Sequence, residues 1–192
     1  KKSMVLSLTP VLTHFAKRAP WIIVLAALGM VSGMVVTGHQ GMLASLVILA
    51  AFMPMLADTG DNTGSQSAAL IIRGLALGQI SAADTLKVLW KELRVALLLS
   101  VLLGFLTFIR VLFFSGGPQL PAGVSLEQIG GAIALALSLQ MVSATLIGAL
   151  RPIAAVALEL DPAVAANPAL TTIVDITGRL IYFTTVTLLV PM

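Results

Sequence analysis

The stretch from Asn167 to Tyr182, NPALTTIVDITGRLIY, is apolar enough to enter a membrane, yet it carries two charged residues, Asp175 and Arg179. Its polar and small residues recur every three or four positions, which places them on one face of an α-helix. They are Asn167, Thr171, Asp175, Gly178 and Tyr182. Because polar groups that face lipid are costly, we expect this face to contact protein or water. An acidic residue at such a place marks an ion or proton path by default, and an Asp175–Arg179 pair that serves packing alone is the alternative.

The composition of the whole chain is typical of an integral membrane protein. Of its 192 residues, 58% are hydrophobic and 10% are charged, and the mean hydropathy is +1.06. Soluble domains carry roughly 25% charged residues, so we predict an all-α membrane protein without a separate soluble domain. The sequence has no cysteine, which excludes disulfides and thiolate metal sites.

Five apolar runs predict membrane-spanning helices. They cover residues 21–36, 42–77, 95–114, 126–150 and a last run that holds Asn167 to Tyr182. In the first run, Gly29 and Gly33 form a small-xxx-small pair that favours close helix packing. Residues 1–20 are predicted to form a separate amphipathic segment on the inner membrane surface, with a frayed tail as the alternative. We interpret His39, in the turn after the first run, as a surface residue.

The second run is interrupted by the polar segment DTGDNTGSQS, residues 58–67, and contains Pro54. We predict either two half-helices joined by polar backbone or one long kinked helix, because non-helical backbone at membrane depth needs a cavity or a protein cover. An ordinary loop outside the membrane is the alternative. Carboxylate and amide oxygens are hard ligands that suit Mg²⁺ or Ca²⁺. The segment offers such oxygens at Asp58, Asp61 and Asn62.

Three further features concern the third and fourth runs. Residues 79–94 are predicted to be a polar connection, in which Ser81 and Asp84 have the spacing of a helix cap. Arg110, near the far end of the third run, is expected to snorkel toward the interface. In the fourth run we interpret a stripe of small or polar residues as a helix-packing surface first and a pore lining second. The stripe consists of Ser138, Met141, Thr145 and Gly148.

Lysine and arginine residues gather on one side of the predicted spans, and this bias orients the chain. With the N-terminus inside, the inner side holds Lys1, Lys2, Lys17, Arg18, Arg73, Lys87, Lys91, Arg94 and Arg151. The predicted outer loops, around His39 and over residues 115–125, contain no lysine or arginine. We therefore predict five spans, with the N-terminus inside and the C-terminus outside.

Several separated motifs, in matching order, resemble the MgtE family of magnesium channels. The earlier motifs are Pro54, then TGDNTGSQS at residues 59–67, then Arg73-Gly74-Leu75-Ala76. The later ones are Gly148 with Pro152, Asp161-Pro162-Ala163, Asn167-Pro168 and Asp175-Ile176-Thr177-Gly178. The likeness runs from about Trp21 to the end, so residues 21–192 are interpreted as an MgtE-like transmembrane pore domain.

The resemblance implies a homodimer of five-helix protomers with a pore along the two-fold axis. Asp175 then corresponds to the family's pore aspartate and Asn167 to the asparagine near the inner end of the pore, with Thr171 and Gly178 on the same pore-facing stripe. The soluble N-terminal and CBS regulatory domains common in the family have no counterpart in this sequence. We therefore expect either an isolated membrane domain or a branch of the family without them.

Two residues depart from the family's pattern, since the family usually has glycine at the place of Asp61 and an apolar residue at the place of Arg179. The added carboxylate of Asp61 is expected to raise the local concentration of divalent cations. A pore-facing Arg179 would repel a dication. We therefore predict that Arg179 points away from the axis and pairs with Asp58 or Asp61, with snorkelling to the outer interface as the alternative.

Together these features predict a channel that conducts a hydrated divalent cation, first of all Mg²⁺, into the cytoplasm across the inner (plasma) membrane. Mg²⁺ is here the transported ion. The predicted metal-site residues are Asp58, Asp61, Asn62, Asn167, Thr171, Asp175 and Gly178. A secondary transporter that exchanges the cation for H⁺ or Na⁺ is the alternative, because broken helices and a midplane acid suit it as well.

Other classes of function are disfavoured. Neither His14 nor His39 has a partner at metal-ligand spacing, so the sequence does not indicate an intramembrane enzyme. The small Lys17-Arg18 cluster does not indicate nucleic-acid binding. The predicted partners are a second copy of the chain, the lipid bilayer and divalent cations.

Overall fold

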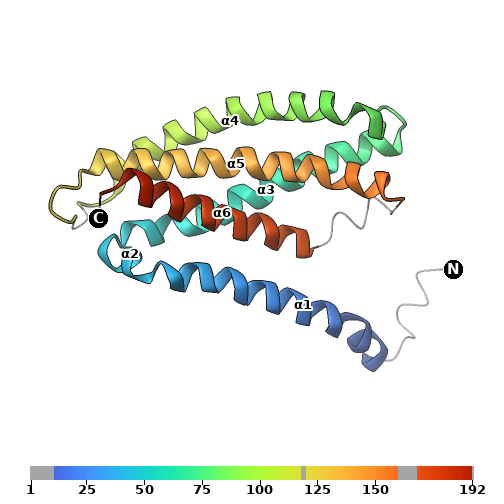
Figure 1. Ribbon diagram of the computed structural model, residues 1–192, viewed down its shortest axis with the longest axis horizontal. Helices are drawn as coiled ribbons and strands as arrows, with labels where there is room; N and C mark the ends of the chain where they lie inside the picture. Colours follow the sequence, from blue (N-terminus) through green and yellow to red (C-terminus); the bar gives the residue numbers. More distant parts are fainter. Residues whose placement is uncertain (1–10, 118–119, 160–167, 192) are drawn as a thin grey trace.

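The computed structural model describes residues 11–117, 120–159 and 168–191, and these residues form helices and connecting turns. In chain order the helices are α1 Val11–Gly38, α2 Gln40–Ser45, α3 Ile48–Ala76, the 3-10 helix η1 Ala82–Asp84, α4 Thr85–Phe114, α5 Leu126–Ala157 and α6 Pro168–Leu189. The long helices lie along the long axis of the molecule, and α5 packs against α3, α4 and α6 (Figure 1). α1 lies along one edge, next to α6, and diverges from the other helices toward its N-terminal end.

Among the described residues, four helices are long and apolar enough to cross a membrane, namely α1, α4, α5 and the Thr172–Leu189 part of α6. The prediction of an all-α membrane protein is therefore confirmed for the described residues. α3 has 29 residues, a length of about 44 Å, but its middle is polar. The fifth span and the orientation of the termini stay predictions.

α3 runs as one continuous helix through Pro54 and through the whole polar segment of residues 58–67. Two expectations are therefore wrong: the half-helices joined by polar backbone, and the loop outside the membrane. A continuous helix satisfies its own backbone hydrogen bonds, which a membrane demands. Side chains add to this, since the Thr63 hydroxyl donates to the carbonyl of Thr59 at 2.8 Å.

α1 is the least embedded of the long helices, and Ser32 is its one buried residue. A Cβ atom at Gly29 or at Gly33 would meet nothing within 4 Å, so this glycine pair does not serve packing between described parts of the chain. The helix also begins at Val11 and continues through Pro20, which joins residues 11–20 to the predicted first span. A position of these residues on the membrane surface stays a prediction.

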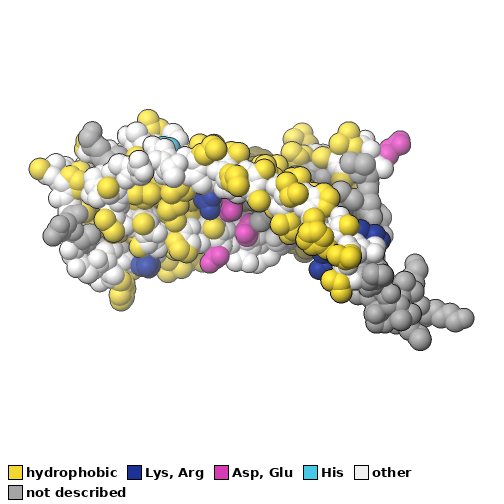
Figure 2. Space-filling model, turned by 90° about the horizontal axis from the view of Figure 1, so that it is seen from below, with side chains coloured by type: hydrophobic (Ala, Val, Ile, Leu, Met, Phe, Trp, Pro, Cys, Tyr) yellow, Lys and Arg dark blue, Asp and Glu magenta, His cyan; other side chains and the backbone are white. Residues whose placement is uncertain are grey.

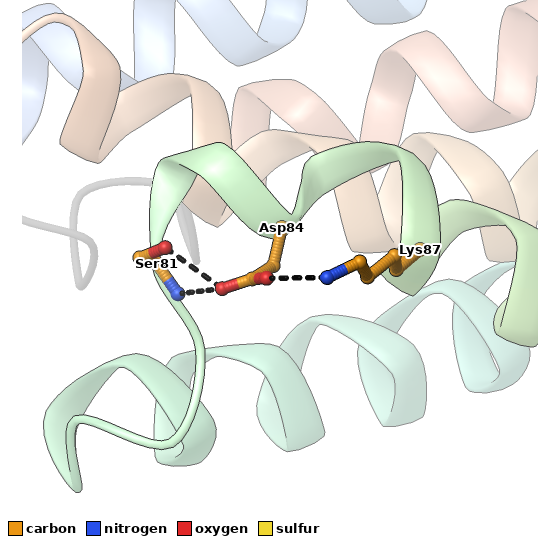
Figure 3. Close-up of polar contacts among 3 residues, drawn as sticks. All are labelled: Ser81, Asp84 and Lys87. Atoms are coloured by element: carbon orange, nitrogen blue, oxygen red, sulfur yellow. Dashed lines mark hydrogen bonds and ion pairs between the residues drawn. The ribbon is translucent and has the colours of Figure 1, made fainter.

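Ser81 and Asp84, the predicted capping pair, bond to each other at the start of η1, which leads directly into α4 (Figure 3). The Asp84 carboxylate accepts hydrogen bonds from the Ser81 hydroxyl at 2.7 Å and from the Ser81 backbone N–H at 3.1 Å, and it lies 3.6 Å from the Lys87 ammonium group. These hydrogen bonds hold the pKa of Asp84 below its usual range. The polar connection predicted over residues 79–94 is wrong from Thr85 onward, because α4 already begins there.

Large apolar side chains of α3, α5 and α6 pack together around Tyr182 and Phe183, which are fully buried. The Tyr182 hydroxyl donates to the carbonyl of Leu49 on α3 at 3.0 Å. The ring of His39 stacks on that of Phe183, with 4.4 Å between the ring centres, and its Nδ1 lies 2.7 Å from the carbonyl oxygen of Val35. The interpretation of His39 as a surface residue is therefore wrong.

Candidate cation site

The junction of α3, α5 and α6 is built around the buried amide of Gln140, which is 1% exposed. Its Nε2 donates to the carbonyl of Val174 on α6 at 3.1 Å, and its Oε1 accepts from the Ser143 hydroxyl at 3.1 Å. Glycines on the two neighbouring helices make room for it, because a Cβ atom at Gly60 or at Gly178 would come within 2.5 Å of Nε2. Gln140 therefore sets the position of α3 relative to α6.

Asp61 of α3 and Asp175 of α6 adjoin this junction. Asp61 follows Gly60 and Asp175 follows Val174, and a Cβ atom at Gly60 would lie 3.1 Å from the Val174 side chain. The charges of Asp175 and Asp58 both act on Asp61. One carboxylate oxygen of Asp61, Oδ1, is buried and has no hydrogen-bond partner among the described residues. The fold thus brings together predicted ligands from two distant parts of the sequence.

Two arginine residues lie near these carboxylates. Arg151, near the end of α5, acts on Asp61 through its charge. Arg179 has one guanidinium nitrogen, Nη2, 3.9 Å from Oδ2 of Asp175, while Nη1 donates to the hydroxyl of Ser32 on α1. The predicted pairing of Arg179 with α3 is therefore wrong. The snorkelling alternative is wrong as well, since the side chain is held between two helices.

A cavity of about 530 Å³ opens along the face of α3 that carries Asp58 and Asn62. Its lining residues are Ala51, Pro54, Met55, Asp58, Thr59, Asn62, Thr63, Leu103, Arg110 and Met141. The Arg110 guanidinium lies over the ring of Phe52, 4.3 Å from its centre, and its snorkelling toward the interface stays a prediction. In Figure 2, acidic side chains with a basic one beside them occupy the middle of a mostly apolar or uncharged face.

The structure describes the remaining predicted ligands to different extents. Gly178 packs against Gln140, which accounts for its small size, and its role in the ion path stays a prediction. Thr171 lies in the first turns of α6, and Asn167 lies outside the described residues. Within residues 11–117, 120–159 and 168–191, no group of three or more His, Cys, Asp or Glu side chains is arranged to hold a metal.

Sequence reasoning missed Gln140. On this helix the sequence pattern indicated a different set of residues, the stripe of Ser138, Met141, Thr145 and Gly148. Its predicted role in helix packing is confirmed at two of these positions. The Ser138 hydroxyl donates to the carbonyl of Ser100 on α4 at 2.9 Å, and Gly148 touches the backbone of α3. The available signal was that an amide in the middle of a long apolar run has to find buried partners.

The chain is similar in sequence to a known protein family and to several of its members. The family model MgtE, described as a divalent cation transporter, matches residues 53–185. The chain is similar to proteins named magnesium transporter MgtE, with 38% identity over 172 residues in Thermus thermophilus, 32% over 167 in Bacillus subtilis and 31% over 168 in Enterococcus faecalis. These alignments cover 90%, 87% and 88% of this chain but 36%, 35% and 35% of the relatives. The chain thus spans about a third of their length.

Proposed function

The chain belongs to the MgtE family of divalent cation transporters, and from this premise we propose that it conducts Mg²⁺ through a passive pore. The observation that carries the proposal is that Asp61 from α3 and Asp175 from α6 directly follow Gly60 and Val174, which face each other across these two helices, so that two half-buried carboxylates adjoin one junction of an otherwise apolar bundle. Carboxylates within a membrane are costly and mark ion or proton paths. The names of the three relatives, magnesium transporters, support Mg²⁺ as the cargo.

The ion passes through this pore with its water shell. Mg²⁺ dehydrates reluctantly, so a site that stripped all of its water would conduct slowly. Carboxylates that lie one water molecule away from the ion can hold it through that shell. Asp61, Asn62 and Asp175 supply the hard oxygens for such a site, and Thr171 and Asn167 extend the path toward its inner end.

The pore lies on the two-fold axis of a homodimer. A single Asp175 carries one negative charge, whereas the two copies in a dimer balance the charge of a divalent cation. The surface of the protomer supports the same assembly, because Asp58 and Asn62 are exposed on α3. Polar side chains that face lipid are costly, and a second protomer would cover them.

α3 is the fifth membrane span, the N-terminus lies inside and the C-terminus outside. A membrane potential then drives the cation inward without a further energy source. Each charge gains about 2.3 kcal/mol per 100 mV, so a dication gains about 4.6 kcal/mol. The predicted inner side carries nine of the eleven lysine and arginine residues, which agrees with the bias of natural membrane proteins.

Flux into liposomes tests the proposal. The purified chain is reconstituted around a Mg²⁺ indicator, and uptake is recorded with and without gradients of pH and of Na⁺. We expect uptake that follows the Mg²⁺ gradient and the membrane potential alone. Uptake that requires a H⁺ or Na⁺ gradient would instead identify a secondary exchanger, and an absence of uptake above that of protein-free liposomes would contradict transport altogether.

A further inference from the structure

We propose that Arg179 is a tethered competitor of the transported cation at Asp175, and that Ser32 on α1 holds its guanidinium when the cation takes the carboxylate. The inference deepens the proposed function and rests on it. It assigns roles in the ion path to a residue of α6 that departs from the family's pattern and to a residue of the outermost helix.

The geometry of the guanidinium carries the first step. Its two terminal nitrogens reach two acceptors on different helices, the Asp175 carboxylate on α6 and the Ser32 hydroxyl on α1. The distance to Asp175 is 3.9 Å, whereas a direct charge-assisted hydrogen bond measures about 2.7–2.9 Å. The ion pair is therefore loose, and Ser32 is the closer partner. A cation can approach Asp175 without first breaking a short hydrogen bond.

The burial of the three side chains carries the second step. The side chains of Arg179 and Asp175 are 24% and 26% exposed, so water and ions reach the pair. Ser32 is 2% exposed and is the one buried residue of α1. A polar side chain buried alone on an apolar helix is costly unless it is hydrogen-bonded. Its hydrogen bond with Arg179 meets that requirement and sets the guanidinium on the α1 side of α6.

Charge balance gives the consequence for transport. With no cation present, Arg179 partly neutralises Asp175. An arriving cation has to outcompete this fixed positive charge, and Ser32 remains as the acceptor for the displaced guanidinium. The repulsion from Arg179 scales with the charge of the cation just as the attraction to Asp175 does, so a dication experiences both. Arg179 therefore weakens cation binding at Asp175.

Two substitutions with opposite expected effects test the inference. Arg179→Met removes the competitor, so we expect Mg²⁺ to bind about tenfold more tightly and K⁺ leak into liposomes to rise. Ser32→Ala removes the acceptor that receives the guanidinium, so we expect Mg²⁺ binding to weaken about threefold. The double variant should resemble Arg179→Met, because Ser32 acts only through Arg179. Calorimetric titration of the purified chain with Mg²⁺ measures all three affinities.

Controls separate this role from a structural one. Arg179→Lys keeps the positive charge and should keep the K⁺ leak low. Ser100→Ala removes another buried serine, on α4, whose hydroxyl donates to the carbonyl of Leu97 in its own helix at 2.9 Å, and it should leave Mg²⁺ affinity unchanged. Thermal melting shows that each variant is folded.

The inference is overturned if Arg179→Met weakens Mg²⁺ binding or leaves it unchanged, or if Ser32→Ala tightens it. If Arg179→Met does not fold, two other variants decide, namely Ser32→Ala and the double variant that combines Ser32→Ala with Arg179→Lys. Weaker Mg²⁺ binding in these variants supports the inference, and unchanged Mg²⁺ binding contradicts it. Failure of the proposed function gives a different result. The wild-type chain would then show no Mg²⁺ flux, whatever the order of the affinities.

Discussion

The glycines at the centre of the bundle and those of α1 occupy opposite surroundings, although both groups lie in apolar helices. A Cβ atom at Gly148 on α5 would come within 2.2 Å of the carbonyl oxygen of Gly64 on α3. A Cβ atom at Gly29 or Gly33 on α1 would meet nothing within 4 Å. A small-residue pattern therefore indicates that a helix can be approached closely, and the neighbouring helix decides whether it is.

Polar residues are also held differently in these two regions of the molecule. At the centre, close backbone packing holds Gln140 and thereby fixes the relative positions of Asp61 and Asp175. At the edge, α1 meets α6 through the hydrogen bond between Ser32 and Arg179. Substitutions at the centre should therefore change both folding and ion conduction, whereas substitutions on the open face of α1 should change neither within one protomer.

The largest effect is expected for the central carboxylate. Asp175→Ala should abolish divalent uptake into liposomes, while the protein still folds and forms the proposed dimer. Asp175→Asn should lose most of the activity, because the geometry remains and the charge does not. Melting temperature and size-exclusion chromatography verify the fold and the assembly of both variants. Normal flux from a folded Asp175→Ala protein would remove Asp175 from the ion path.

The two groups of glycines are compared directly by matched substitutions. Gly148→Ala forces the backbones of α5 and α3 apart, so we expect a loss of about 2 kcal/mol in the free energy of unfolding. Gly29→Ala should be neutral or stabilise by up to about 1 kcal/mol through helix propensity. Unfolding in detergent measures both. Equal effects would contradict the contrast, and a change of oligomeric state in Gly29→Ala would show that a second copy packs on α1.

The central amide should have a smaller effect on stability. Gln140→Leu keeps the volume of the side chain but removes the hydrogen bond to the Val174 carbonyl, and hydrogen bonds between membrane helices are worth about 0.6 kcal/mol on average and up to about 1.7. We expect a loss of about 1 kcal/mol in stability together with weaker Mg²⁺ binding. Ser143→Ala, which leaves the bond to Val174 in place, is the matched control. Unaltered Mg²⁺ binding in a destabilised Gln140→Leu protein would limit Gln140 to packing.

The smallest effect is expected for Asp61, an acid on α3. Asp61→Gly should weaken Mg²⁺ binding a few-fold at low ionic strength without stopping conduction. The reason is that the loss of one carboxylate makes the electrostatic potential around Asp175 less negative. The effect should fade at high salt, where the charges are screened. Titrations at two salt concentrations measure it, and an unchanged affinity at low ionic strength would count against a role of Asp61 in attracting cations.

Much of this account was predictable from the sequence because it depends on composition and on periodic patterns. The apolar runs predicted a helical membrane protein, and the motifs from Pro54 to Gly178 predicted the family, which the comparisons confirm. Family membership also confirms that the chain is not an enzyme. Together with the apolar helices, it confirms a multi-pass protein of the plasma membrane.

Other features depend on which helices pack together, and the sequence pattern does not carry that information. The glycines and polar residues of α3 have low helix propensity, which favoured a broken helix, but a membrane penalises unpaired backbone more strongly. The partner of Arg179 was mispredicted because Ser32 lies on a helix far away in the sequence. Gln140 was missed because its packing partners lie on other helices, at Gly60, Val174 and Gly178. Asn167 lies outside the described residues, and its role stays a prediction.

The central claim is that Asp61 and Asp175 face one shared cation path. Anomalous diffraction from crystals grown with Mn²⁺, a divalent ion with the same preference for oxygen ligands, tests it most directly. We predict an anomalous peak beside Asp175, separated from the carboxylates of Asp175 and Asp61 by water molecules, that disappears in crystals of Asp175→Ala. A peak at Asp84 near the start of α4, with none beside Asp175, would contradict the account.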